Sequence, residues 1–330
     1  MHVCFLDPLE DRIKEFPGQY LADHRVTYAN GQPADVPADT EVLITWSGLV
    51  DSSLIDRLPD LRLVQRIGYF RGGGDLQAVA DRGVAVAVWP HGVLNRVAMH
   101  TLMFMVSLSR QLLPSHELTI EGVNEIGMEP TFADQRPIAM NWPKVANVGT
   151  PANKTLGIVG FGEAGACLAH LAAPLDMEIL YYKRNRLTPS QEAFYGVKYA
   201  PLDDLLKQSD FVATFVPYST ESERTFGARE FGLMKPTAYF LNTGRANTTD
   251  EAALIDALKN NRIAGAGLDV FSYEPLPPDN PLPTLKNVVL TPHNAGGVGG
   301  WHDVFERISG NLARVQAGRR PVSWGAPPPP

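Results

Sequence analysis

A glycine-rich segment, TLGIVGFGEAG at residues 155–165, has the residue types and the spacing to hold a pyrophosphate. In such a motif the first glycine permits a tight turn, the second lets the backbone approach a phosphate, and the third allows a helix to pack closely on a strand. An apolar run precedes the motif and a helical pattern follows it, so the phosphate would lie at the positive end of a helix. We therefore predict that this loop binds a dinucleotide through Gly160, Phe161, Gly162, Glu163, Ala164 and Gly165.

Three cations follow the glycine motif. Lys183, Arg184 and Arg186, in YYKRNR, lie 18 to 21 positions after Gly165, where dinucleotide-binding folds usually carry an Asp or Glu that holds a ribose hydroxyl of NAD. Cations at this place would instead bind the 2′-phosphate of NADP, and each charge-assisted contact contributes about 1.5–3 kcal/mol. Two such contacts would favour NADPH by about a hundredfold or more. We predict that NADP(H) is preferred over NAD(H); a solvated basic loop is the alternative.

The elements that must position these groups alternate between short apolar runs and helical patterns, which is typical of an α/β fold with parallel sheets. The motif opens only the second of two such series, so we predict two doubly wound units, one of flavodoxin type and one of Rossmann type. The expected strands are residues 2–7, 25–29, 41–46, 63–67 and 84–89 in the first unit, and 155–160, 178–182, 211–216, 238–243, 266–270 and 288–292 in the second.

The helical patterns add three expectations. Residues 97 to about 117 read as one long helix, apolar nearly all round and therefore buried. Residues 121–153, rich in Pro, Gly and Asn, read as a loop. Amphipathic helices are expected over residues 250–261, which open on acidic residues, and over about 302–317, which end at Gly318.

Composition limits the classes of protein and partner. The chain has 330 residues, 44% of them hydrophobic and 20% charged, which indicates a globular protein of two domains. The net charge of −7 disfavours nucleic acid or an anionic membrane as a partner. Cys4 and Cys167 match no metal or redox spacing, and the first residues lack a signal-peptide pattern. We therefore expect a cytoplasmic protein without a metal site.

Several further motifs occur in one characteristic order. After the glycine motif come FVPYSTESERTFG (215–227), LNTGRANTTDEAAL (241–254), GLDVFSYEPLP (267–277) and NVVLTPHNAGG (287–297). Together with NRVAMHTL (95–102), these motifs make the chain resemble the D-isomer-specific 2-hydroxyacid dehydrogenases, such as glyoxylate/hydroxypyruvate reductases. The resemblance covers about residues 40–320.

The resemblance implies a split architecture. Residues 1–98 and 298–330 would form a discontinuous substrate domain, and residues 99–297 the dinucleotide-binding Rossmann domain. Substrate would lie between them, at the carboxyl ends of the strands. The resemblance also implies a homodimer, in which Trp142 could reach the partner's site.

The resemblance assigns the chemistry to three residues. Arg245, in NTGRAN, would bind the carboxylate of a 2-oxo acid and polarise its carbonyl. His293, in TPHNAGG, would donate the proton, and Glu274, in SYEPLP, would orient His293 and favour its imidazolium form. Asp269 would bind the nicotinamide carboxamide. The other cofactor contacts implied are Val216, Pro217 and Thr243.

The expected substrate pocket departs from the family pattern. Around residues 68–75 the chain reads GYFRGGGD, and Tyr69, Phe70 and Arg71 are expected to face the substrate. Phosphoglycerate-type members carry an arginine after LIT, where this chain has Trp46 and then Ser47. We therefore expect a substrate without a phosphate, in a pocket with apolar, aromatic walls that include Trp46 and Ser47.

Three functions remain open from the sequence. The first is NADPH-dependent reduction of glyoxylate, hydroxypyruvate or a bulkier 2-oxo acid to the D-2-hydroxy acid. The second is a nucleotide-sensing scaffold like the C-terminal-binding corepressors, which share this fold; the compact chain and its basic cluster count against it. The third is a phosphite or formate dehydrogenase. The long N-terminal extension expected of formate enzymes is not found, whereas phosphite would also bind between an arginine and a histidine.

Overall fold

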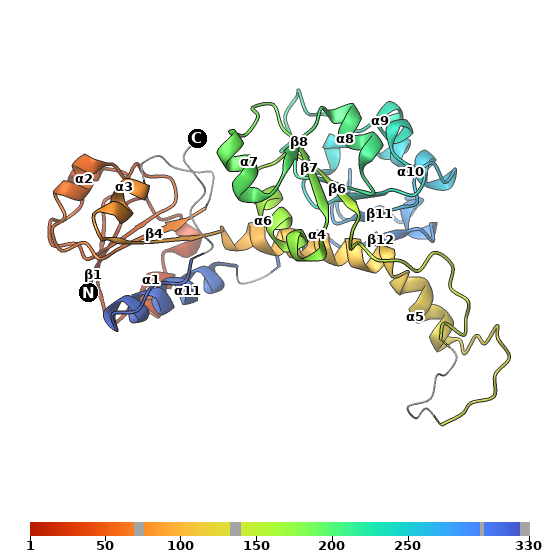
Figure 1. Cartoon of the computed structure of the whole chain (residues 1–330), viewed down its shortest axis with the longest axis horizontal. Coiled ribbons are helices and arrows are strands. Elements are labelled where there is room, and N and C mark those ends of the chain that lie inside the picture. Colours follow the sequence, from red (N-terminus) through yellow and green to blue (C-terminus); the bar gives the residue numbers. More distant parts are fainter. Residues whose placement is uncertain (69–75, 133–139, 298–299, 324–330) are drawn as a thin grey trace.

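The computed structural model describes residues 1–68, 76–132, 140–297 and 300–323. It consists of two lobes, each built on a parallel sheet (Figure 1). The first lobe holds the N-terminal strands, and the second holds the strands that follow residue 154. In the described part of the chain, no helix has the length and apolar character needed to cross a membrane.

The first sheet has five parallel strands in the order β2-β1-β3-β4-β5, the flavodoxin-like order. β1, β3 and β4 are buried along their whole length, because helices cover both faces of a parallel sheet. This burial explains why their sequences are continuous apolar runs. The bounds are β1 (His2–Phe5), β2 (Arg25–Tyr28), β3 (Val42–Thr45), β4 (Leu63–Ile67) and β5 (Ala85–Trp89).

The helices of the first lobe come from both ends of the chain. The C-terminal helix α11 (Gly300–Gln316) packs Val304, Phe305 and Ile308 into the same core as β1 and β3. It lies beside α1 (Figure 1). The first lobe is therefore built from both ends of the chain. The other helices of this lobe are η1 (Asp11–Ile13), α1 (Phe16–Tyr20), η2 (Pro33–Asp35), α2 (Ser52–Asp56) and α3 (Leu76–Asp81).

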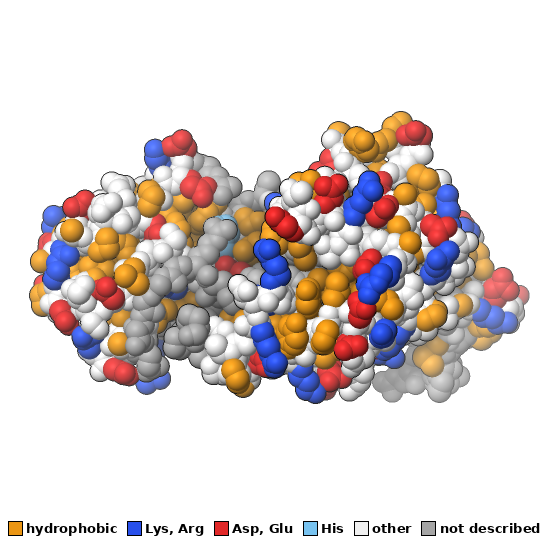
Figure 2. Space-filling view, turned by 90° about the horizontal axis from the view of Figure 1, so that it is seen from above, with side chains coloured by type: hydrophobic (Ala, Val, Ile, Leu, Met, Phe, Trp, Pro, Cys, Tyr) orange, Lys and Arg blue, Asp and Glu red, His pale blue; other side chains and the backbone are white. Residues whose placement is uncertain are grey.

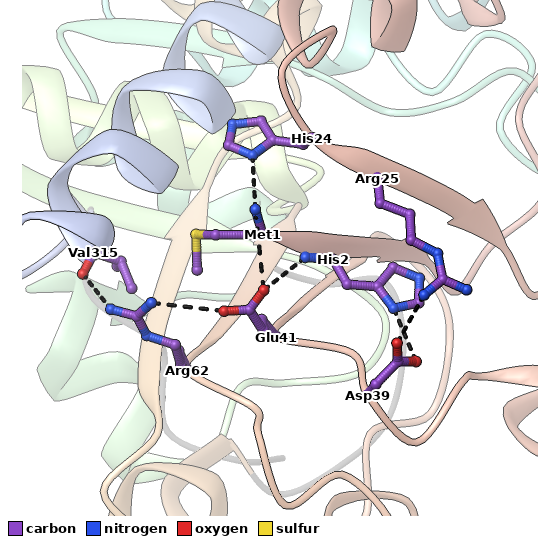
Figure 3. A network of polar contacts seen from close by, with 8 residues as sticks. All are labelled: Met1, His2, His24, Arg25, Asp39, Glu41, Arg62 and Val315. Carbon is purple, nitrogen blue, oxygen red and sulfur yellow. Dashed lines mark hydrogen bonds and ion pairs between the residues drawn. The ribbon is translucent and has the colours of Figure 1, made fainter.

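A polar network fastens α11 to the amino-terminal edge of the first sheet (Figure 3). Arg62 donates from Nη2 to the carbonyl oxygen of Val315 at 2.9 Å, and its Nη1 lies 3.7 Å from a carboxylate oxygen of Glu41. Glu41 in turn accepts a hydrogen bond from the backbone N–H of His2 at 2.8 Å. The last turn of the chain's final helix is thereby connected to its first strand, at the edge opposite the candidate site.

The second sheet has seven parallel strands in the order β12-β11-β10-β9-β6-β7-β8, which is the Rossmann order with one added strand. All six strands expected for this sheet are confirmed, whereas β8 was not predicted, because two residues give no recognisable pattern. The bounds are β6 (Thr155–Val159), β7 (Glu178–Tyr182), β8 (Lys198–Tyr199), β9 (Phe211–Thr214), β10 (Tyr239–Asn242), β11 (Gly265–Leu268) and β12 (Val288–Leu290).

Helices cover both faces of the second sheet. One core contains Phe104, Phe161 and Tyr181, and the other contains Phe231 and Phe240. The helix predicted from its acidic start is α10, whose N-cap Asp250 accepts a hydrogen bond from Ala253 N at 3.1 Å. The bounds are α6 (Glu163–Ala172), η3 (Ala173–Leu175), α7 (Pro189–Tyr195), α8 (Leu202–Gln208), α9 (Ala228–Leu233), η4 (Ala246–Thr248), α10 (Glu251–Lys259) and η5 (Leu282–Thr284).

The prediction of one buried helix over residues 97–117 is wrong. The structure has α4 (Gly92–Ser109) and α5 (Leu112–Ile120), separated by Gln111, whose φ of 51° is left-handed. A left-handed residue ends a helix because it turns the backbone away from the helical path. α4 is partly buried, whereas α5 has no buried residue. An all-round apolar sequence did not distinguish a buried helix from an exposed one.

The two segments that join the lobes pack directly on each other. A Cβ added to Gly92 would lie 2.2 Å from the carbonyl oxygen of Gly300, so only glycine permits this approach. Nearby, Arg96 of α4 forms an ion pair with Asp303 of α11, with 2.6 Å between Nη2 and Oδ2. The outgoing and the returning chain are therefore held together at the junction between the lobes.

Candidate active site

The glycine motif lies where the strand order of the second sheet reverses, between β6 and β9. Gly160 has a φ of 87°, and a Cβ there would lie 2.8 Å from the backbone nitrogen of Val216, just after β9. A Cβ on Gly165 would lie 3.1 Å from the Ile158 side chain, so the third glycine brings α6 close to β6. Doubly wound sheets bind ligands at this switch point, at the carboxyl ends of the strands.

The second glycine has a different environment. A Cβ added to Gly162 would meet no protein atom within 4 Å, so the protein itself does not require glycine there. Open space above the first turn of α6 suits a group that the backbone must approach closely, as a pyrophosphate requires. Phe161 and Ala164 are buried, so they can contribute only backbone atoms to a ligand. The residues present fit a dinucleotide.

The three cations lie at the carboxyl end of β7 and differ in their surroundings. Lys183 is half-buried, and burial lowers its pKa. Arg184 is exposed, and its charge contributes to the lowered pKa of Glu221, whose largest cause is a hydrogen bond from Ser219. Arg186 forms a bidentate pair with Glu192, from Nε at 2.8 Å and Nη2 at 3.0 Å.

The structure brings His293 and Glu274 together. Nδ1 of His293 lies 2.6 Å from Oε2 of Glu274, and both side chains are partly exposed. Arg245, which follows β10, lies close enough for its charge to act on Glu274. Its backbone carbonyl accepts hydrogen bonds from Thr248 Oγ1 at 2.7 Å and Asn242 Nδ2 at 3.2 Å, so its position is fixed by its own turn.

The ionisation of Glu274 follows from these neighbours. Burial by itself would raise the pKa of Glu274, but the hydrogen bond with His293, the N–H of Phe271 and the charges of His293 and Arg245 outweigh it. The pKa of Glu274 is therefore held below its ordinary value. The group remains a carboxylate at neutral pH and accepts a hydrogen bond from the imidazole.

Residues 103–295, more than half of the chain, match the family model for the D-isomer specific 2-hydroxyacid dehydrogenase, NAD binding domain. A glyoxylate reductase of Thermococcus gammatolerans is 34% identical over 286 residues, 86% of this chain and 82% of that protein. A glyoxylate/hydroxypyruvate reductase B of Klebsiella pneumoniae is 37% identical over 264 residues, 79% of this chain and 77% of that protein. The chain belongs to the D-isomer specific 2-hydroxyacid dehydrogenase family.

Solved structures agree with this family in fold. A D-lactate dehydrogenase of Aquifex aeolicus, complexed with NAD and lactic acid, superposes with a TM-score of 0.54 at 22% identity, covering 96% of each chain. An NADPH-dependent glyoxylate/hydroxypyruvate reductase of Sinorhizobium meliloti superposes with a TM-score of 0.53 at 24% identity, covering 98% of this chain and 96% of that one. This dehydrogenase is thus an oxidoreductase with an NAD-binding domain.

Asp269 of this dehydrogenase is buried, and its carboxylate is occupied by the loop that carries His293. It accepts hydrogen bonds from Thr291 Oγ1 at 2.6 Å, Asn294 N at 2.9 Å and Ala295 N at 2.8 Å. A carboxylate has about four acceptor positions, so three bonds leave little capacity for a nicotinamide. In this structure Asp269 positions the histidine loop.

The remaining expected cofactor contacts also follow strands of the second sheet. Val216 is partly buried and Pro217 exposed, directly beyond β9. Thr243 follows β10, and its hydroxyl lies 2.8 Å from that of Thr101 on α4. His100, one residue earlier on α4, contacts Thr291 Oγ1 at 2.9 Å.

On the substrate side, Trp46 and Ser47 are held by a residue that the sequence analysis missed. Asp7, at the end of β1, accepts hydrogen bonds from Trp46 N at 2.8 Å and Ser47 N at 3.0 Å, and also from the Ser47 hydroxyl. Beneath this turn, Arg66 is buried and donates to the Gly48 carbonyl oxygen at 3.2 Å. The signal for Asp7 in the sequence was a charged residue directly after an apolar strand. Tyr69, Phe70 and Arg71 lie outside the described residues.

Proposed function

We propose that this dehydrogenase catalyses the NADPH-dependent reduction of a small 2-oxo acid to the D-2-hydroxy acid. The observation that carries the proposal is the pair of His293 and Glu274, 2.6 Å apart, with Arg245 beside it on the edge that holds the glycine motif. A proton donor, a group that keeps it charged and a carboxylate-binding cation are the parts that such a reduction needs.

Each residue would then have one task. Arg245 binds the substrate carboxylate with its planar guanidinium and polarises the adjacent carbonyl. A dinucleotide held at the glycine motif would supply the hydride to the carbonyl carbon. His293 gives a proton to the carbonyl oxygen, and the carboxylate of Glu274 stabilises the imidazolium form of His293 before the transfer. The product is a 2-hydroxy acid, and His293 is left neutral.

The preference for NADPH rests on the cations after β7. We favour Lys183 and Arg184 for the 2′-phosphate; the Nε and Nη2 atoms of Arg186 bind Glu192. At the position where an NAD-binding protein carries an Asp or Glu, this chain has Lys183. The half-buried ammonium of Lys183 would contribute most, since partial burial strengthens its interaction with a phosphate.

Glyoxylate or hydroxypyruvate is the substrate we favour. Relatives at 34–37% identity carry these substrates in their names, and they match most of this chain.

The assignment of residues 1–98 and 298–330 to a substrate domain, and of 99–297 to a dinucleotide-binding domain, is part of the same proposal. Acidic and basic side chains are intermingled on the face shown in Figure 2, so that face does not offer a continuous basic surface for nucleic acid.

The test is a spectrophotometric assay with NADPH and NADH against glyoxylate, hydroxypyruvate and phenylpyruvate, with chiral analysis of the product. We expect NADPH to be oxidised with at least one of them and the D-isomer to form. Phosphite and formate are also assayed with NADP, and oxidation of either would favour a phosphite or formate dehydrogenase. The proposal is overturned if no 2-oxo acid is turned over, and cofactor binding without turnover would favour the nucleotide-sensing scaffold.

We also propose a homodimer, built on exposed apolar residues of α4 and α5. Met99, Met103 and Val106 follow each other at helical spacing on α4 and are 40–55% exposed. A hollow of about 940 Å³ lies at the α4–α5 junction and is lined in part by Leu112 and Leu113. Figure 1 shows α5 projecting from the second lobe. Contiguous exposed apolar surface of this kind marks an interface, and a second copy is the proposed occupant.

A further inference from the structure

Glu163 is a buried carboxylate within the glycine motif. It is the first residue of α6, and only 7% of it is exposed. An acidic residue in the first turn ordinarily stabilises a helix from the solvent side. Here the same helix end is the expected place of a pyrophosphate, so a second negative charge disfavours the ligand unless the carboxylate has another task.

The carboxylate of Glu163 faces the other lobe. Its Oε1 accepts a hydrogen bond from the backbone N–H of His91 at 2.6 Å, immediately before α4 begins. A Cβ added to Gly68, directly after β4, would lie 3.3 Å from its Oε2, and Gly68 has a φ of 103°. Gly68 is itself tied to β5, donating to the Trp89 carbonyl oxygen at 2.7 Å. Glu163 therefore lies against the ends of both β4 and β5.

The surroundings of Glu163 are poorly solvated. Burial raises the pKa of the Cys167 thiol, and the charge of Glu163 adds to that increase. Burial and the same charge also raise the pKa of Tyr195. Because Glu163 is buried, its hydrogen bond from His91 is stronger than the same bond in water would be.

We propose that Glu163 is a positioning residue that holds the dinucleotide loop against the ends of β4 and β5, and so sets the distance between cofactor and substrate. The segment expected to face the substrate begins directly after Gly68, and the helix that joins the lobes begins directly after His91. One carboxylate on the cofactor loop thus binds His91 and lies beside Gly68, at the starts of these two segments. The proposal rests on the proposed function, because it concerns how the two reactants of that reaction are aligned.

The first experiment needs no turnover. Backbone amide exchange at His91 is measured in the cofactor-free wild type, in Glu163→Ala and in Glu163→Gln. Alanine removes the acceptor, and we expect exchange at His91 to become at least about tenfold faster. Glutamine keeps an acceptor oxygen and is expected to retain most of the protection. Glu178→Ala, which removes an exposed carboxylate paired with Lys198, is the matched control and should exchange as the wild type does.

The second experiment separates the cofactor from the substrate. We expect Glu163→Ala to raise the KM for the 2-oxo acid several-fold, while the Kd for NADPH, from fluorescence titration, is unchanged or lower because a negative charge is gone. Glu163→Gln should restore the KM and bind NADPH with the same Kd as Glu163→Ala, because both variants lack the charge. Wild-type exchange at His91 in Glu163→Ala would overturn the proposal, and so would equal loss of NADPH binding in both variants with an unchanged KM. A wild type without turnover would refute the proposed function and leave the exchange result standing.

Discussion

His293 adopts a backbone conformation that few histidines have. Its φ of 51° lies in the left-handed region, which costs a non-glycine residue about 1–2 kcal/mol. The hydrogen bonds from Asn294 N and Ala295 N to Asp269 hold the following residues in place. Such a conformation persists because the neighbouring contacts over-determine it, and it leaves the imidazole facing Glu274. His293 is thus positioned by two carboxylates. One is the buried Asp269, just after β11, and the other is Glu274, to which the imidazole is bonded.

The first prediction concerns Glu274. In Glu274→Gln, the amide can still bond to the imidazole of His293 but carries no negative charge, so kcat/KM for the reduction should fall. The pKa of Glu274 is depressed, so in the wild type its carboxylate is lost only as pH falls below the range in which a glutamate ordinarily titrates. Rate profiles of kcat/KM between pH 5 and 9 check this. His293→Ala should lower kcat at every pH while NADPH binding is retained; an unchanged profile in Glu274→Gln contradicts the role assigned to it.

The second prediction concerns cofactor choice. Replacing Lys183 and Arg184 together by alanine should reduce the ratio of kcat/KM for NADPH to that for NADH by about a hundredfold, since each lost contact accounts for about tenfold. Arg186→Ala should have a smaller effect, because Glu192 already binds its guanidinium. Lys198→Ala, an exposed lysine on β8, is the control. A wild type that prefers NADH would show that the cluster has another role.

At the scale of elements, α4 connects both parts of the site. It begins beside Glu163. Along the helix, Thr101 bonds to Thr243, and Phe104 packs against Gly267 of β11. Its contacts with α6 and with the ends of β10 and β11 make it the common support of the cofactor loop and the catalytic loops. A change in its packing should therefore be measurable as a loss of stability of the second lobe.

The third prediction follows from that packing. A Cβ added to Gly267 would lie 2.6 Å from Cγ of Phe104, so Gly267→Ala should lower the free energy of unfolding by about 1–3 kcal/mol. Gly310→Ala is the matched control. Gly310 lies within α11, where a Cβ meets nothing within 4 Å, and alanine there should stabilise by about 0.5–1 kcal/mol. The free energy of unfolding of both variants is measured in urea, and equal values for the two would contradict this account of α4.

At the scale of the whole molecule, the exposed apolar face of α4 and α5 sets the expected assembly. The fourth prediction is that the wild type elutes at twice its 36.1 kDa mass in light-scattering chromatography, and that Met103→Glu shifts it to the monomer. A charge at a buried interface is costly because it loses its hydration. Phe194→Glu, on the exposed surface of α7, should leave the mass unchanged. A monomeric wild type would remove the dimer from the proposal.

The sequence by itself determined most of the architecture. Apolar runs such as residues 63–67 and 155–159 predicted buried parallel strands, because strand burial leaves a local pattern in the chain. The glycine spacing predicted the loop at the switch point, since a residue with a φ near the 87° of Gly160 is normally a glycine. The order of the motifs identified the family, and the structure brings His293 to Glu274 as that identification implies.

Only the tertiary structure decided which polar groups meet. Glu163 contacts His91, 72 positions away, and Asp7 holds a turn that lies 39 or 40 positions along the chain. A side chain's local sequence does not say which distant backbone it approaches. The division of α4 from α5 has the same cause, because exposure depends on what packs against a helix. Periodicity predicts which face of an element is apolar, whereas the tertiary structure determines what that face contacts.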